Sequence, residues 1–184
     1  SIALMGDNGA GKSTLFTFLI GLLNPSTGSI LIHGKNISQL NAAERALVIG
    51  LLFQEAERQF FHHTVFNEVA YGLKIRRMPT PLIHETTENI LEEFMLLHHK
   101  DSHPLDLNAA EKRLVTLASL AVLDQPVLLL DEPSRDLDDD WLALFEHWLA
   151  KAQKKGTTII TISHDPAFIE RNFEKVLTLS GGSF

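Results

Sequence analysis

Short apolar runs alternate with helix-length segments along this chain, and the alternation predicts its elements. Runs rich in aliphatic and β-branched residues predict strands over residues 2–5, 29–33, 48–53, 127–130, 157–163 and 175–179. The segments that read as helices are residues 11–23, 42–47, 139–154 and 165–172, with turns at 25–28 and 34–36. Apolar strands that alternate with helices are typical of a parallel sheet with helices on both faces. The pattern therefore predicts an α/β fold.

One long block departs from this alternation. Residues 55–124 are mostly helical in character, with Pro79, Pro81 and Pro104 as breaks. We predict a helical subdomain over about residues 57–126, inserted into a core of about residues 1–56 and 127–184 within one domain. The chain has no initiator methionine and residues 1–5 already read as a strand. We therefore expect it to begin inside a domain.

Composition narrows the class of protein. The 184 residues include 16 Lys and Arg against 23 Asp and Glu, and the net charge of −7 disfavours binding to nucleic-acid phosphates. Cysteine is absent from the sequence, which excludes disulfides, thiolate zinc sites and cysteine nucleophiles. The longest apolar runs, residues 15–23 and 46–53, are shorter than a membrane helix of about 20 residues. We expect a soluble, cytoplasmic domain with no nucleic acid as partner.

A glycine-rich segment follows the first predicted strand and precedes the first predicted helix. Residues 6–13 match the pattern G-x-x-x-x-G-K-[ST], whose glycines let successive backbone N–H groups point at phosphate oxygens. Lys12 would neutralise the β- and γ-phosphates, and the Ser13 hydroxyl would bind Mg²⁺. The alternative is a glycine-rich turn with an incidental lysine. The candidate nucleotide-binding residues are Gly6, Asp7, Asn8, Gly9, Ala10, Gly11, Lys12, Ser13 and Thr14.

Two carboxylates end the apolar strand at residues 127–130. Ligands bind at the carboxyl ends of strands in open α/β sheets, so Asp131 and Glu132 are candidates for that edge. Asp131 would hold Mg²⁺, mostly through water, and Glu132 would act as the general base on the attacking water. The alternative is a strand that runs into an acidic turn, since Pro133 follows at once.

These motifs, taken in order, resemble the nucleotide-binding domain of ATP-binding-cassette (ABC) proteins over essentially the whole chain. The resemblance rests on residues 6–14, 130–133, 137–138 and 163–165, together with Gln54. It implies the fold of a P-loop NTPase, a mostly parallel sheet flanked by helices. It implies that Gln54 contacts Mg²⁺ and the lytic water, and that His164 contacts the γ-phosphate. Residues 134–138 resemble the loop that crosses to a second subunit, although Asp136 stands where a small residue is usual.

Residues 53–54, 59–61 and 64–69 most resemble the energy-coupling-factor importers of cobalt and vitamins. The resemblance implies a subunit that hydrolyses ATP with Mg²⁺ to power import. Its partners would be membrane-spanning subunits and a second ABC ATPase domain, and its place the inner face of the cell membrane. One alternative is an ABC ATPase of DNA repair or translation, which the acidity disfavours. Another is a regulatory module that binds ATP without turnover, against which Glu132 argues.

One segment differs from the family. Residues 107–111 read Leu-Asn-Ala-Ala-Glu where the family carries L-S-G-G-Q. Asn108 and Glu111 predict a capping box at the start of a helix. The two alanines add Cβ atoms, and Glu111 adds negative charge, where the family binds the γ-phosphate on the opposite subunit. This predicts a heterodimer or tandem pair with one weak ATP site. Residues 40–44 repeat the same letters, so the pattern also fits helix capping alone.

Two further features receive ordinary structural interpretations. Histidines occur at His62, His63, His98, His99 and His103, but without nearby cysteine we expect solvated side chains rather than a metal site. Two tryptophans seven residues apart, at positions 141 and 148, predict packing residues on a helix. Residues 179–183 imitate the L-S-G-G-Q motif, but no helix follows, so we interpret them as a turn.

Overall fold

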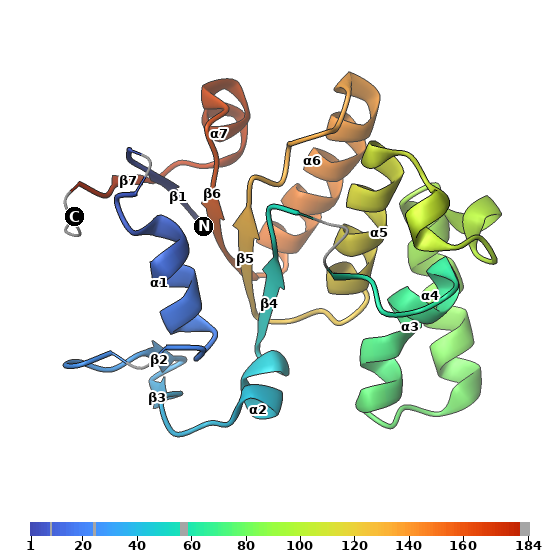
Figure 1. The fold of residues 1–184 in the computed structure, drawn as a ribbon, viewed down its shortest axis with the longest axis horizontal. Coiled ribbons are helices and arrows are strands. Elements are labelled where there is room, and N and C mark those ends of the chain that lie inside the picture. Colours follow the sequence, from blue (N-terminus) through green and yellow to red (C-terminus); the bar gives the residue numbers. More distant parts are fainter. Residues whose placement is uncertain (8, 24, 56–58, 181–184) are drawn as a thin grey trace.

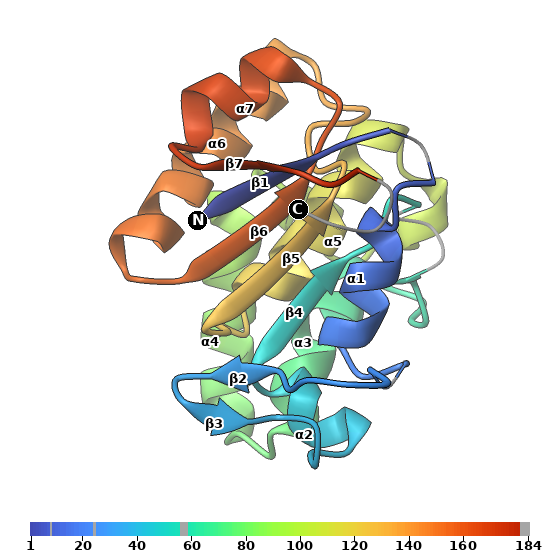
Figure 2. The same cartoon turned by 90° about the vertical axis from the view of Figure 1, so that its left-hand side faces the viewer.

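The computed structural model describes residues 1–7, 9–23, 25–55 and 59–180. Five parallel strands form the central sheet (Figures 1 and 2): β1 (Ile2–Met5), β4 (Ile49–Leu52), β5 (Val127–Asp131), β6 (Thr158–Ile162) and β7 (Val176–Thr178). Their spatial order is β4-β5-β6-β1-β7. All four neighbouring pairs are parallel. The predicted α/β fold with a mostly parallel sheet is confirmed.

Both faces of the sheet are covered because side chains alternate along each strand. On one face Leu4 and Leu129 pack in the same apolar cluster as Phe16 of α1 (Lys12–Leu19). On the other face Leu128 and Leu130 join the larger cluster. That cluster includes residues of α5 (Ala109–Ala121), α6 (Asp139–Lys154) and α7 (Pro166–Asn172). Figure 1 shows α1 on one side of the strands and α5 and α6 on the other.

The long middle block is helical, as predicted. It contains α3 (Val65–Ile75), α4 (Thr80–Glu93), the 3₁₀ turns η2 (Leu97–His99) and η3 (Pro104–Asp106), and α5. The N-cap of α4 is Pro79, and Pro104 begins η3, so these prolines mark element starts. Buried side chains of α3, α4 and α5 belong to the same apolar cluster as the sheet. The subdomain boundary near residue 57 falls outside the described residues, and the division into two parts stays a prediction.

The segment after the first helix differs from the sequence prediction. The helix predicted over residues 11–23 ends at Leu19, and Gly21 then adopts a φ of +81°. The predicted strand over 29–33 is reduced to β2 (Leu31–Ile32), which pairs antiparallel with β3 (Lys35–Asn36) outside the main sheet. The turn between them has positive φ at His33 and Gly34, as a tight hairpin requires. Residues 35–36, predicted as a turn, are therefore the second strand of a hairpin.

Several local predictions are confirmed. Asn41 and Glu44 form the capping box of α2 (Ala42–Ala46), with both hydrogen bonds present. Trp148 is buried against Phe94 and Phe145, and Trp141 packs against the same cluster. Within the described part of the chain, no helix is both long and apolar enough to span a bilayer.

Candidate nucleotide-binding site

The glycine-rich loop connects the end of β1 to the start of α1. Its glycines adopt left-handed backbone conformations, with φ of +141° at Gly6, +84° at Gly9 and +101° at Gly11. A Cβ atom on Gly6 would lie 2.2 Å from the carbonyl oxygen of Leu179, so this position needs glycine for space as well as for φ. The Ala10 N–H donates to the Asp7 carbonyl across 3.1 Å and closes the turn. Asn8, also predicted here, lies outside the described residues.

Lys12 carries the positive charge of the loop. Its side chain is buried, and the ammonium donates to the carbonyl oxygens of Gly6 at 2.6 Å and Asp7 at 3.0 Å. The loop therefore wraps around its own lysine. Because α1 begins at Lys12, the positive end of the helix dipole adds to the same region.

A pocket of about 440 Å³ opens beside this loop at the carboxyl ends of the strands. It brings together most of the predicted residues from four separate parts of the chain. Its lining consists of Gly9, Gly11, Lys12, Ser13, Thr14, Gln54, Asp131, Glu132, Ile162 and His164. Of the other predicted residues, Gly6, Asp7 and Ala10 do not line the pocket but build the loop behind it.

Two carboxylates with different surroundings face the pocket. Burial raises the pKa of Asp131, and the neighbouring charge of Glu132 raises it further, while Arg113 and Lys12 act in the opposite direction. Glu132 has a φ of +50°, which is uncommon for a residue with a side chain, and its N–H donates to the Ile162 carbonyl across 2.8 Å. The backbone of β6 therefore holds Glu132 in this conformation.

The two oxygens of the Glu132 carboxylate have different surroundings. Oε2 accepts from the His164 N–H at 3.2 Å, and His164 Nε2 lies 3.8 Å from Oε1. Oε1 is buried and has no hydrogen-bond partner among the described residues. A buried oxygen that lacks a donor is poised to accept a hydrogen bond from a molecule in the pocket.

Arg113 is a site residue that sequence reasoning missed. Its side chain is fully buried, and it donates to the carbonyl oxygens of Phe53 (2.8 Å), Gln54 (3.2 Å), Glu132 (2.7 Å) and Arg135 (3.4 Å). Burial lowers the pKa of this guanidinium, although arginine stays protonated in proteins. One side chain of α5 thus connects the loops that carry Gln54 and Glu132. The signal that could have identified Arg113 is its place as a cationic residue directly before the mainly apolar segment at 114–118.

The segment that departs from the L-S-G-G-Q motif forms a capped helix. Asn108 Oδ1 accepts from the Glu111 N–H at 2.9 Å, and Glu111 Oε2 accepts from the Asn108 N–H at 3.1 Å. The predicted capping box of α5 is confirmed. Asp136 has a φ of +66°, a region in which a small residue or an Asp is tolerated.

Comparison with known proteins decides the family. A family model described as ABC transporter matches residues 1–135. The chain belongs to the ABC transporter family. As a member of that family it is an ATP-binding ATPase domain, and the pocket beside the glycine-rich loop is its candidate ATP site.

Two similar proteins are named as components of particular ABC transporters. The energy-coupling factor transporter ATP-binding protein EcfA1 of Mycoplasma pneumoniae is 30% identical over 181 residues, covering 98% of this chain and 66% of the relative. The structure of CbiO1 from Clostridium perfringens, part of the ABC transporter complex CbiONQ, has a TM-score of 0.86 at 32% identity. It covers 99% of this chain and 74% of that one.

Two further matches support the family and the fold. A relative in Methanosarcina mazei is 35% identical over 181 residues, which is 98% of this chain and 31% of the relative. The chain thus spans about a third of the length of the first relatives it matches. A dimeric ATP-binding cassette with bound ADP and Pi has a TM-score of 0.87, covering 99% of this chain and 82% of that one. At 22% identity it supports the fold alone.

Proposed function

We propose that this ABC domain binds ATP with Mg²⁺ and hydrolyses it to power an importer of the energy-coupling-factor type, as one member of a heterodimer or tandem pair. One observation carries the proposal. The loop around Lys12, the carboxylates Asp131 and Glu132, Gln54 and His164 all line a single pocket. A polyphosphate needs a cradle of N–H groups and a cation, and its hydrolysis needs a base, and this pocket supplies each of them.

The donor set of the pocket fits magnesium. The Ser13 hydroxyl, the Asp131 carboxylate and the Gln54 side-chain oxygen are hard oxygen ligands of the kind that Mg²⁺ prefers. When bound, the ion would neutralise charge on the phosphate oxygens. Lys12 would bind the same phosphates, and the buried Asp131 carboxylate, whose pKa is raised by burial and by Glu132, would be stabilised in its ionised form by the ion.

Glu132 is the general base of the proposed reaction. Its Oε1, which has no hydrogen-bond partner among the described residues, would accept a proton from the attacking water. Gln54 would orient that water, and His164 would contact the γ-phosphate. Arg113 is a positioning residue because it holds the backbone of Glu132 and of Gln54 at once. Loss of these hydrogen bonds would misplace the base relative to the water.

A second hollow supports a membrane-spanning partner. A mainly apolar groove of about 550 Å³ lies between α2, the end of β4 and α3, and its wall includes large hydrophobic side chains that remain exposed. These are Leu22, Leu47, Phe53, Phe61, Tyr71 and Ile75. Exposed apolar patches of this kind mark interaction sites. We assign the groove to a cytoplasmic segment of the membrane subunits, which would place the domain at the inner face of the membrane.

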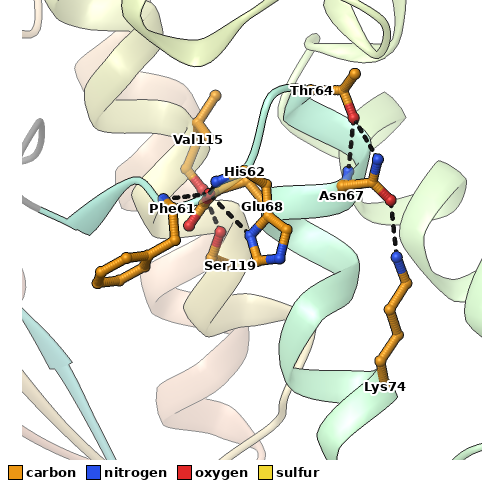
Figure 3. Close-up of polar contacts among 8 residues, drawn as sticks. All are labelled: Phe61, His62, Thr64, Asn67, Glu68, Lys74, Val115 and Ser119. Atoms are coloured by element: carbon orange, nitrogen blue, oxygen red, sulfur yellow. Dashed lines mark hydrogen bonds and ion pairs between the residues drawn. The ribbon is translucent and has the colours of Figure 1, made fainter.

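Polar contacts around the buried Glu68 and at the start of α3 hold one edge of the groove in place (Figure 3). The Glu68 carboxylate of α3 accepts from the N–H groups of Phe61 at 2.9 Å and His62 at 2.8 Å. Thr64 caps the same helix by accepting from the Asn67 N–H, and Lys74 donates to the Asn67 side chain. The exposed ring of Phe61 is thereby presented from a defined loop, as a docking residue requires.

The altered segment at 107–111 supports pairing with a different ATPase domain. In head-to-tail pairs of this family, that segment serves the nucleotide of the partner. The Cβ atoms of Ala109 and Ala110 and the charge of Glu111 weaken it. The chain's own pocket, in contrast, is lined by Lys12, Ser13, Gln54, Asp131, Glu132 and His164. One strong and one weak ATP site would result.

Nucleotide titration and ATP turnover test the proposal. The isolated chain should bind ATP, Lys12→Ala should lose binding, and turnover should rise sharply when a partner domain with an intact L-S-G-G-Q motif is added. In that pair Glu132→Gln should lower turnover at least about 100-fold. The control Glu170→Gln changes an exposed residue of α7 and should behave like the wild type. If the pair with Glu132→Gln hydrolysed ATP as fast as the wild-type pair, this would favour a regulatory ATP-binding module. Vigorous ATP turnover by the lone chain would refute the weak-site pairing.

A further inference from the structure

Two histidines and a glutamate meet at the start of α5, although the sequence predicted solvated side chains for the histidines. His98 and His99 end η2, and Glu111 lies in the first turn of α5. Ligand atoms of the three side chains all lie within 4.8 Å of one another. His99 Nε2 is 3.2 Å from Glu111 Oε1, and the rings of His98 and His99 have centroids 4.0 Å apart.

Neighbouring groups orient the two innermost ligands. His99 Nδ1 lies 3.4 Å from the hydroxyl of Ser102, which leaves Nε2 directed at Glu111. Glu111 uses Oε2 in the capping box, where it accepts from the Asn108 N–H, and this leaves Oε1 for His99. Metal-binding histidines and carboxylates are typically held in this way through their second heteroatom.

The three side chains of the cluster differ in how far they are exposed to solvent. The side chains of His99 and Glu111 are 27% and 19% exposed, whereas His98 is exposed at the surface. An ion held by three protein ligands would therefore keep a coordination position open to water. The cluster is distinct from the nucleotide pocket, because none of its residues lines that pocket.

We propose that His98, His99 and Glu111 form a binding site for a divalent transition-metal ion, with Zn²⁺ as the best-fitting ion. Two imidazoles and one carboxylate form a ligand set that suits Zn²⁺, Co²⁺ or Ni²⁺ rather than Mg²⁺ or Ca²⁺, which prefer oxygen alone. The pairing of the three residues needs the turn between α4 and α5, since Glu111 lies 12 positions after His99. The site lies outside this chain's own nucleotide pocket, although Glu111 belongs to the segment at 107–111 that would serve the nucleotide of the partner domain.

Zinc titration of the purified chain by isothermal calorimetry tests this site. Saturating ADP and excess Mg²⁺ keep the carboxylates of the nucleotide pocket occupied during the titration. The wild type should bind one Zn²⁺, and bound Co²⁺ should show visible absorption bands that Zn²⁺ displaces. His99→Ala and Glu111→Gln should each lower the affinity by more than about tenfold, and Ser102→Ala by about tenfold.

The variants separate metal binding from folding. Glutamine at position 111 can still complete the capping box, so Glu111→Gln should keep the helix content and the thermal midpoint of the wild type. His147→Ala, which removes an exposed histidine of α6, is the matched control and should bind Zn²⁺ like the wild type. Absence of Zn²⁺ binding by the wild type overturns the proposal. So does an affinity that His99→Ala and Glu111→Gln leave unchanged, or that His147→Ala lowers equally.

Discussion

Replacement of Arg113 by methionine should destabilise the protein and disrupt its site at the same time. Methionine has a similar length but cannot donate hydrogen bonds, so four carbonyl oxygens lose a charged donor. Two of these bonds are short, at 2.7 Å to Glu132 and 2.8 Å to Phe53. Hydrogen bonds to charged groups contribute about 1.5–3 kcal/mol each.

The net effect is smaller than the sum of the bonds. Two short bonds together represent about 3–6 kcal/mol. The variant also removes the desolvation penalty of a buried guanidinium, the same effect that lowers the pKa of Arg113. We expect a loss of about 3 kcal/mol in the free energy of unfolding. Equilibrium unfolding in urea measures this quantity directly.

Two further variants make the experiment specific. Arg113→Lys keeps the charge but offers a single ammonium. It cannot replace both Nη1, which donates to the Phe53 carbonyl, and Nη2, which donates to the Glu132 carbonyl, so it should recover only part of the stability. Arg135→Met removes a half-exposed side chain paired with Asp136 and should stay within about 0.5 kcal/mol of the wild type. ATP turnover of the Arg113 variants should fall more than ATP affinity. An unfolding free energy of Arg113→Met within about 0.5 kcal/mol of the wild type would refute the reasoning.

Three other substitutions have defined outcomes. Asp131→Asn should raise stability towards urea at pH 7 and abolish Mg²⁺-dependent nucleotide binding. The pKa of Asp131 is raised above 3.8 in the folded state, so folding disfavours its ionised form at pH 7. The gain in stability of Asp131→Asn should therefore disappear below about pH 3.8, where Asp131 is protonated in both the folded and the unfolded state. A variant that is less stable than the wild type at pH 7 would contradict this. Gly6→Ala should lower the thermal midpoint far more than Gly28→Ala. Both positions have positive φ, but only at Gly6 would the Cβ meet a backbone oxygen, at 2.2 Å, and equal effects would contradict the steric argument. Asn108→Ala should cost about 1 kcal/mol of stability through the lost cap of α5, with Asn41→Ala as its counterpart in α2; no change in chemical denaturation would argue against the capping box.

The amino-acid sequence by itself determined the local features of this protein. Strands β1, β4 and β5 coincide with mainly apolar runs and β6 with a β-branched run, because a strand covered on both faces favours such residues along its whole length. The glycine-rich loop and both capping boxes were also predictable, since their hydrogen bonds join residues within a few positions of one another. The spacing of glycines, Lys12 and Ser13 was enough to identify the phosphate-binding loop.

Only the tertiary structure decided which distant residues meet. The spatial order of the strands places the loop before α1 beside Asp131, Glu132 and His164. The donors of Arg113 reach carbonyls up to 60 positions away. Likewise, the turn between α4 and α5 brings Glu111 to His99, so a cluster that reads as separate histidines becomes a candidate metal site. Such contacts leave no local pattern because they depend on how helices pack on the sheet, and packing is a property of the whole fold.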